Sequence, residues 1–340
     1  MKILKHKHPF KTESGAILPE LDIAYDTWGK LNEKSDNVIW VCHALTANSD
    51  VESWWPGMVG EDMVFDIKKC FIVCANILGS CYGTTGPLSE NPGTSQPWLN
   101  NFPVITVRDV VRIHEILRRH LGISSIHTII GSSIGGYQAL EYSIMYPDLI
   151  QRLIFIASNA RTSPWAIAFN ESQRLAIEAD DSFFGKDTDG GKKGLKAARS
   201  IALLSYRTAY AYNQTQAEDT DEKTGSFRAS SYQAYQGDKL VKRFNPWSYY
   251  RLTQLSDSHN VGRERGGVFK ALKKVKSSTL CIGIRSDLLF PVSEQKFVAE
   301  NVKKGQYAEI DSFFGHDGFL IEAGQVSSVI REFWEETSGK

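Results

Sequence analysis

The residues best suited to chemistry lie in one short stretch, residues 129–136, which reads IIGSSIGG. Gly131, Ser133 and Gly135 form a G-x-S-x-G pattern, in which a nucleophilic serine occupies a tight turn between a strand and a helix. The apolar, largely β-branched residues 126–130 predict the strand, and the good helix formers after the turn predict the helix. The Ser133 hydroxyl would then lie at a helix N-terminus, where free N–H groups favour developing negative charge.

A serine hydroxyl becomes a useful nucleophile when a base takes its proton and an acid orients that base. In folds with this turn, the three residues follow in the order Ser, acid, His. Asp287 follows a predicted strand that ends at Ile284, and His316 follows one that ends near Ile310. The sequence therefore predicts a Ser133–Asp287–His316 catalytic triad.

Other residues compete for these roles and are weaker candidates. The alternative acid position, after the strand that ends near residue 157, holds Asn159, which cannot ionise. Asp311 is too close to His316 along the chain to come from a separate strand end. His43 follows a strand but precedes the serine, against the expected order.

The negative charge that forms during acyl transfer needs two N–H donors. We expect one from the backbone of Ile134, directly after the nucleophile, and one from Leu45, in the loop after the predicted strand 38–42. The alternative, that residues 43–46 form an ordinary turn, stays open at this point.

Composition excludes several classes of function. The 340 residues are 42% hydrophobic and 23% charged, as in a globular protein with a large core. Lys and Arg number 39, as do Asp and Glu, so no net field favours nucleic acid or an anionic membrane. No apolar run approaches the ~20 residues that span a bilayer. Residues 1–8 contain no apolar signal core, so we expect a cytoplasmic protein.

The five cysteines do not predict a metal site. Their odd number and their apolar surroundings indicate reduced thiols. Cys70, Cys74 and Cys81 could be combined into a zinc site, but residues 71–73 have the pattern of a core strand. We expect no bound metal.

Strands and helices alternate over most of the chain, which predicts a mostly parallel sheet covered by helices on both faces. Strands are expected near 21–25, 38–42, 70–75, 153–157, 279–284 and 307–310, with helices over 107–121 and from 293. Between about 159 and 270 this alternation stops, and helices are expected over 172–178 and 195–212. We therefore predict a core of residues 1–160 and 271–340, interrupted by a helical lid over 161–270. The basic run of Lys192, Lys193, Lys196 and Arg199 is interpreted as a solvated helix face.

Several motifs together resemble the homoserine O-acetyltransferase family of α/β-hydrolase-fold enzymes. They are His43-Ala44-Leu45-Thr46, the loop 78–87, residues 101–109 (NFPVITVRD), the serine turn, 235–239 (YQGDK), 286–291 (SDLLFP) and Gly315-His316-Asp317. The resemblance covers roughly residues 10–333. It implies an α/β-hydrolase fold and acetyl transfer from acetyl-CoA, a co-substrate and not a resident cofactor, to L-homoserine in methionine biosynthesis. It also implies a cytoplasmic homodimer joined through the lid helices.

Carried over residue by residue, the resemblance assigns the triad to Ser133, Asp287 and His316. It further implies that Arg207 and Asp317 bind homoserine. A zwitterionic substrate suits a guanidinium for its carboxylate and a carboxylate for its ammonium. The alternatives are a salt bridge of the lid for Arg207 and a surface position for Asp317.

Two departures from the family pattern bear on the substrates. Tyr137 stands where many members carry Met, and residues 243–249 read RFNPWSY rather than the commoner RFDANSY. Relatives use succinyl-CoA or accept serine, so donor and acceptor stay open. An esterase with the same triad and a catalytically inactive binding protein are further alternatives. No residues for CoA binding can be named, since no P-loop is present.

Overall fold

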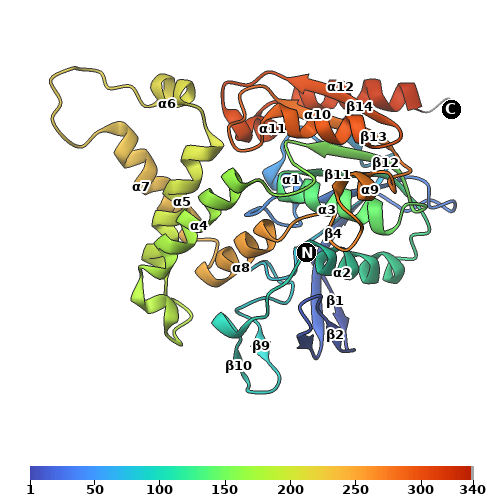
Figure 1. Ribbon diagram of the computed structural model, residues 1–340, viewed down its shortest axis with the longest axis horizontal. Coiled ribbons are helices and arrows are strands. Elements are labelled where there is room, and N and C mark those ends of the chain that lie inside the picture. The colour runs from blue at the N-terminus through green and yellow to red at the C-terminus, as the bar shows by residue number, and fades with distance from the viewer. Residues whose placement is uncertain (338–340) are drawn as a thin grey trace.

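A single eight-stranded sheet lies at the centre of the computed structural model, which describes residues 1–337 (Figure 1). The strands, in their order across the sheet, are β1 (Lys2–His6), β4 (Leu21–Trp28), β8 (Phe71–Ala75), β5 (Val38–Cys42), β11 (Ile126–Ser132), β12 (Ile150–Ile156), β13 (Ser278–Ile284) and β14 (Gly305–Ile310). The β4 strand pairs antiparallel with β1 and β8, and all other neighbours are parallel. The predicted mostly parallel sheet is thus confirmed.

Helices cover both faces of this sheet, as predicted. Those of the core are α1 (Val51–Trp54), α2 (Val107–His120), α3 (Ile134–Met145), α9 (Val268–Leu272), α10 (Val292–Asn301), α11 (Gly318–Ile321) and α12 (Ala323–Thr337). Short strands pair outside the sheet: β2 (Phe10–Lys11) with β3 (Ile17–Leu18), β6 (Val59–Gly60) with β7 (Phe65–Asp66), and β9 (Glu90–Asn91) with β10 (Gln96–Pro97). Three 3₁₀ turns complete these elements: η1 (Leu99–Asn101), η2 (Asp181–Phe184) and η3 (Gly315–Asp317).

The strand β5 illustrates why the central strands are apolar at every position. Ile39 and Val41 point to one face and pack in the cluster that includes α1 and α12. Trp40 points to the other face and packs in the cluster that includes α2, α3 and α10. Successive side chains of a strand alternate between faces, so a sheet covered on both sides needs an unbroken apolar run.

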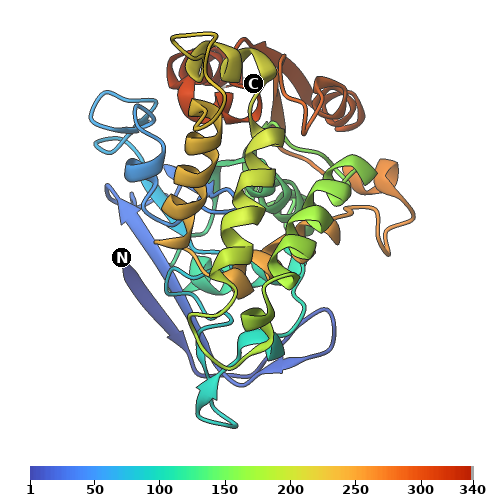
Figure 2. The ribbon, with the colours of Figure 1, turned by 90° about the vertical axis from the view of Figure 1, so that its left-hand side faces the viewer.

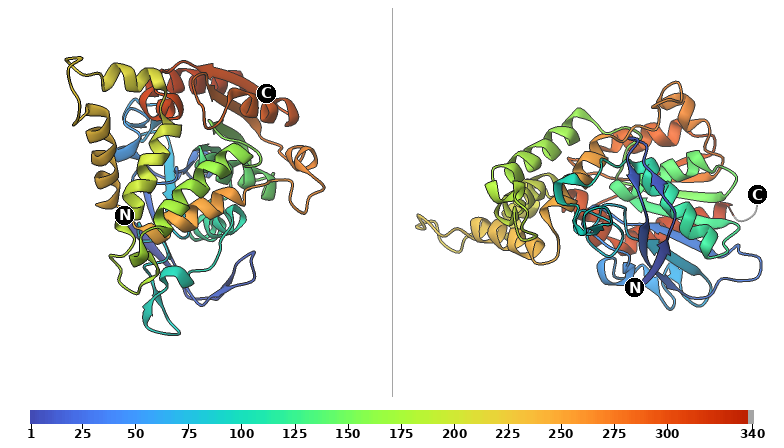
Figure 3. Two further views of the ribbon diagram at one scale, coloured as in Figure 1. Left: turned by 60° about the vertical axis from the view of Figure 1, so that its left-hand side comes forward. Right: turned by 90° about the horizontal axis from the view of Figure 1, so that it is seen from below.

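Between β12 and β13 the chain forms a group of helices outside the sheet: α4 (Pro164–Glu178), α5 (Lys192–Tyr206), α6 (Ala209–Thr215), α7 (Arg228–Val241) and α8 (Pro246–Asp257). They stand beside the sheet in Figure 1 and face the viewer in Figure 2. Both views of Figure 3 show the α6–α7 connection extending away from the core. We call these helices, with their connections, the helical insertion. Its proposed limits at 161 and 270 stay a prediction, and α9 spans the second of them.

The two ends of the helical insertion are tied together where they leave the core. Arg161 and Asn260 form an isolated antiparallel bridge. Beside it, the Thr162 N–H donates to the carbonyl of His259 at 3.0 Å, and the Val261 N–H donates to the carbonyl of Ala160 at 3.0 Å.

The helix predicted over 195–212 is wrong in one respect, because the structure divides it into α5 and α6. Arg207 has extended backbone angles (φ −122°, ψ 157°) and ends α5. Thr208 then begins α6, since its side chain accepts a hydrogen bond from the Ala211 N–H at 3.0 Å. A threonine cap of this kind is a start signal that the apolar periodicity alone did not reveal.

Candidate active site

Ser133 occupies a strained turn between β11 and α3. Its backbone angles are φ 55° and ψ −127°, a region that non-glycine residues seldom adopt. A Cβ atom on Gly131 would lie 2.0 Å from the carbonyl oxygen of Gly135, and one on Gly135 would lie 2.1 Å from that of Cys42. Both positions therefore exclude any side chain. The Ser158 hydroxyl, two residues after β12, donates to the Ser133 carbonyl at 2.8 Å and holds the turn.

Asp287 and His316 form a buried pair. His316 Nδ1 lies 2.6 Å from Asp287 Oδ2, while Asp287 Oδ1 accepts the N–H groups of Leu289 at 2.8 Å and Phe290 at 2.9 Å. This arrangement places the ring proton on Nδ1 and leaves Nε2 as a base. Burial lowers the pKa of His316, but the charge and hydrogen bond of Asp287 outweigh it, together with the charge of Asp317. The net pKa is raised.

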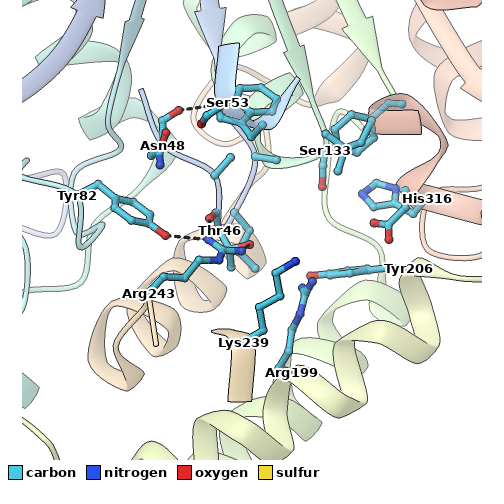
Figure 4. Close-up of a pocket in the computed structure, with 17 residues that line it drawn as sticks. Thr46, Asn48, Ser53, Tyr82, Ser133, Arg199, Tyr206, Lys239, Arg243 and His316 are labelled. Carbon is cyan, nitrogen blue, oxygen red and sulfur yellow. Dashed lines mark hydrogen bonds between the residues drawn. The ribbon is translucent and has the colours of Figure 1, made fainter. Parts of the chain in front are cut away.

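Ser133 and His316 point into the same cavity, which has a volume of about 500 Å³ (Figure 4). One wall comes from the core, including residues 44–48. The opposite wall comes from α5, α7 and the residues just after α7. The structure thus brings the three proposed triad residues together, with Asp287 behind the His316 ring. Their catalytic roles stay predictions.

The two proposed oxyanion-hole residues also meet at this cavity. Ile134 is the first residue of α3, so its N–H has no acceptor within the helix. Leu45 lines the cavity, and neither N–H donates in any hydrogen bond found among residues 1–337. His43 holds the Leu45 loop, with Nδ1 2.8 Å from the Ala44 carbonyl and Nε2 accepting the Ile77 N–H at 3.1 Å. Burial lowers the pKa of His43 to about 4, which makes it a neutral structural residue.

Arg207 and Asp317 are close together, but they bind each other. Arg207 Nε lies 3.1 Å from Asp317 Oδ2, and both side chains are largely buried. Asp317 lines the cavity, whereas Arg207 lies behind it with its guanidinium 5.6 Å from the centre of the Phe314 ring. A substrate that used both groups would have to open this ion pair.

Three cations that line the cavity were not anticipated as site residues: Arg199, Lys239 and Arg243. Arg243 donates to the Tyr82 hydroxyl at 2.8 Å, and the Arg199 guanidinium lies 5.5 Å from the centre of the Tyr206 ring. Within the described residues, none of the three pairs with an acid. The interpretation of Arg199 as part of a solvated helix face is wrong, because α5 turns this residue towards the cavity.

Spacing offered a signal for these cations. Arg199 and Tyr206 are seven residues apart and share one face of α5, and Lys239 and Arg243 are four apart at the end of α7. Without the position of the core loop opposite, however, nothing distinguished this face from a solvated one.

Nothing in the described part of the chain forms a metal-binding group of three or more His, Cys, Asp and Glu side chains. Cys42, Cys70, Cys74, Cys81 and Cys281 are all free thiols. Within residues 1–337, no helix has the length and apolar character needed to cross a membrane.

Comparison with known proteins places the chain in a family. The profile of the alpha/beta hydrolase fold matches residues 37–323. The homoserine O-acetyltransferase of Cyclobacterium marinum is 47% identical over 327 residues, which cover 96% of this chain and 93% of that protein. The crystal structure of homoserine O-acetyltransferase from Staphylococcus aureus is 28% identical with a TM-score of 0.79, covering 97% of this chain and 95% of that one. Esterase E22 is 21% identical with a TM-score of 0.91 and 98% coverage of both chains, a likeness of fold. The chain therefore belongs to the homoserine O-acetyltransferase family of the α/β-hydrolase fold.

Proposed function

We propose that this protein transfers the acetyl group of acetyl-CoA to the hydroxyl of L-homoserine, through an acetyl ester on Ser133. The observation that carries the proposal is the cavity that joins Ser133 and His316 to Asp317 and three unpaired cations. An esterase for neutral esters has no need of these charges. An anionic donor and a zwitterionic acceptor do need them.

The first half of the reaction loads the enzyme. His316 Nε2 takes the Ser133 proton, and the serine oxygen attacks the thioester carbonyl carbon. The N–H groups of Leu45 and Ile134 stabilise the resulting oxyanion. When the carbon–sulfur bond breaks, the CoA sulfur leaves with the proton from His316. Asp287 keeps the imidazole in the required tautomer and stabilises its charged form.

The second half transfers the acetyl group. Asp317, at the cavity wall, would bind the ammonium of homoserine, and Arg207 would turn from Asp317 to the carboxylate. His316 takes the proton of the homoserine hydroxyl, whose oxygen attacks the ester, and returns it to Ser133 as the ester bond breaks. Water could attack the same ester but gains nothing from the two charged groups.

We propose that Arg199, Lys239 and Arg243 bind the phosphates of acetyl-CoA, since all three lack an acidic partner among the described residues. Lys239→Ala should raise the KM for acetyl-CoA several-fold and leave the rate with S-acetyl-N-acetylcysteamine, which has no phosphate, unchanged. Lys242→Ala is the matched control, because Lys242 is exposed next to α7 outside the cavity lining. Equal losses with both donors would mean that Lys239 does not bind phosphate.

Product identification by mass spectrometry tests the activity itself. Acetyl-CoA and succinyl-CoA should each be offered with L-homoserine, with L-serine and with neither acceptor. We expect O-acetylhomoserine as the main product. O-succinylhomoserine or O-acetylserine would identify a different transferase, and rapid acetate release alone would identify an esterase. A fluorophosphonate that fails to label Ser133 would favour a binding protein.

We further propose a cytoplasmic homodimer that associates through the helical insertion. Leu175 on α4, Leu204 on α5 and Tyr235 on α7 are each more than half exposed, which is consistent with an apolar contact surface. Light scattering on the full chain should give twice the chain mass, and Leu204→Glu should give a monomer. A monodisperse monomer of the unmodified protein would refute the dimer.

A further inference from the structure

A second cavity, of about 520 Å³, lies where the helical insertion leaves and rejoins the core. It shares no lining residue with the Ser133 cavity. Its walls come from residues 159–161 after β12, the start of α4, and the helices α9 and α10. The residues that matter to the argument are Asn159, Arg161, Phe269, Glu294 and Phe297.

Polar groups in this cavity lack partners. Asn159 is 3% exposed, and neither its amide oxygen nor its amide nitrogen has a hydrogen-bond partner within the described residues. The buried Oε2 of Glu294 has none either. The Asn159 amide is near enough to favour the ionised form of Glu294, yet the two side chains do not meet hydrogen-bond geometry. Buried groups left this way cost ~1–3 kcal/mol each, so their presence together calls for an explanation.

The charges around the cavity are also unpaired. The Arg161 side chain is exposed and, within residues 1–337, makes no ion pair or hydrogen bond. Glu294 likewise has no cationic partner there. Burial raises the pKa of Glu294 to about 7, the charge of Asp287 adds to the rise, and the Asn159 contact opposes it. By contrast, the guanidinium and carboxylate of Arg207 and Asp317 already satisfy each other.

Two aromatic rings supply an apolar wall. Phe269 and Phe297 pack edge to face with their centres 5.3 Å apart. Phe269 is 61% exposed, so most of its ring surface is accessible. The cavity therefore offers one cation, one acid, one amide and an apolar surface.

We propose that this cavity binds an apolar α-amino acid. Arg161 binds its carboxylate, Glu294 and the amide oxygen of Asn159 bind its ammonium, and the side chain packs on Phe269 and Phe297. The site goes beyond the proposed function, because it shares no lining residue with the Ser133 cavity.

Isothermal titration calorimetry on the full chain at pH 8 tests the proposal with three matched probes. L-leucine carries both charged groups, 4-methylpentanoate lacks the ammonium, and isoamylamine lacks the carboxylate. We expect one leucine per chain and affinities at least roughly 10-fold weaker for each truncated probe. No detectable leucine binding, or equal binding of all three probes, would overturn the proposal.

Variants place the binding event on the chain. Glu294→Gln and Arg161→Gln should each weaken leucine binding by at least roughly 10-fold. Glu300→Gln, an exposed position on the same helix α10, should leave it unchanged. Far-UV circular dichroism and Tm check that each variant is folded. Two results together would assign leucine binding to the Ser133 cavity: saturating L-homoserine abolishes the binding, and both site variants preserve it. These results would overturn the proposal and leave the proposed acetyl transfer unaffected.

Proton release provides a readout that a purely structural role of Glu294 would not give. The titratable and charged groups around this carboxyl are Asp287, Tyr137 and Arg161. A bound ammonium favours the carboxylate, so the pKa of Glu294 falls on binding and a proton leaves near pH 7. Titrations at pH 7 in phosphate and in Tris should therefore differ in enthalpy, and Glu294→Gln should remove the difference. Identical enthalpies for the unmodified protein would refute the role of Glu294.

Discussion

Replacing Arg207 by Ala should separate the two half-reactions. In the proposed mechanism, acylation of Ser133 by acetyl-CoA makes no use of Arg207, so the burst of free CoA should persist at a nearly normal rate. The proposed transfer to homoserine places the guanidinium at the substrate carboxylate, so formation of O-acetylhomoserine should fall. The acetyl ester that remains on Ser133 should then release acetate by slow hydrolysis.

The structure bounds the size of this effect. In the free enzyme Arg207 already binds Asp317 at 3.1 Å, with the two side chains 23% and 16% exposed. The carboxylate of homoserine must replace Asp317 as the partner of Arg207. The net gain in free energy is therefore the difference between these two charge-assisted bonds, plus the gain from the freed Asp317 binding the ammonium. A full hydrogen bond to a charged group contributes about 1.5–3 kcal/mol, so the loss in transfer should be at most roughly 10- to 150-fold.

Quench-flow measurement of CoA release, run beside a product assay, decides the matter. Arg228→Ala is a matched control, since Arg228 is an insertion arginine that binds Asp219 outside the cavity. We expect the control to stay within about 2-fold of the unmodified enzyme. If the burst and the transfer fall together in Arg207→Ala, the residue serves acylation or the packing of α5, and its assignment to the acceptor is wrong.

The other predictions concern the turn and the triad. Ser133→Ala should lower transfer by at least ~10³-fold in a folded protein, and an active variant would exclude the covalent route. Gly135→Ala places a Cβ 2.1 Å from a backbone oxygen of β5, so it should lower the free energy of unfolding, measured with urea, by about 3 kcal/mol or more. The control Gly324→Ala lies in open space on α12 and should change this free energy by less than ~1 kcal/mol. With His316 as the proposed base, acylation needs its neutral form, so the acylation rate should rise with pH through the raised pKa of that group. Asp317→Asn removes a negative charge that helps to raise the pKa of His316. The increase of the CoA release rate with pH, measured by stopped flow, should therefore move to lower pH. A move to higher pH would show that Asp317 does not raise the pKa of His316.

Much of the sheet was predictable because its signals are local. The apolar run 38–42 needs two covered faces, and β5 has those bounds. A helix was expected from residue 107, and the Thr106 side chain forms a capping box with Asp109 at the start of α2. The serine turn was predictable for a similar reason, since only glycine fits at 131 and 135.

The charges of the cavity were less predictable because they depend on contacts between distant segments. The pairing of Arg207 with Asp317 joins residues 110 positions apart. In the sequence, the neighbours of Arg199 are those of a surface residue. Only the fold shows that the core loop 44–48 lies opposite α5 and that Arg199 faces the cavity between them. From the sequence, Asn159 was considered only for the position of the catalytic acid, which an amide cannot fill. The position of its side chain beside α10, without full hydrogen bonds, became visible only in the structure.

The bridge between Arg161 and Asn260 has a consequence for how this fold changes over evolution. An excursion of about a hundred residues would ordinarily carry a large loop-closure entropy, which grows with the logarithm of its length. Here a short antiparallel stem on the core joins the two ends. Because the closure entropy depends only on the logarithm of length, lengthening or shortening the segment beyond the stem changes it little. The sheet and its serine turn are thereby insulated from sequence change in the segment that supplies Arg199, Arg207 and Lys239. The helices of the insertion can therefore diverge while the fold of the sheet stays the same, as in esterase E22, whose fold is alike at 21% identity.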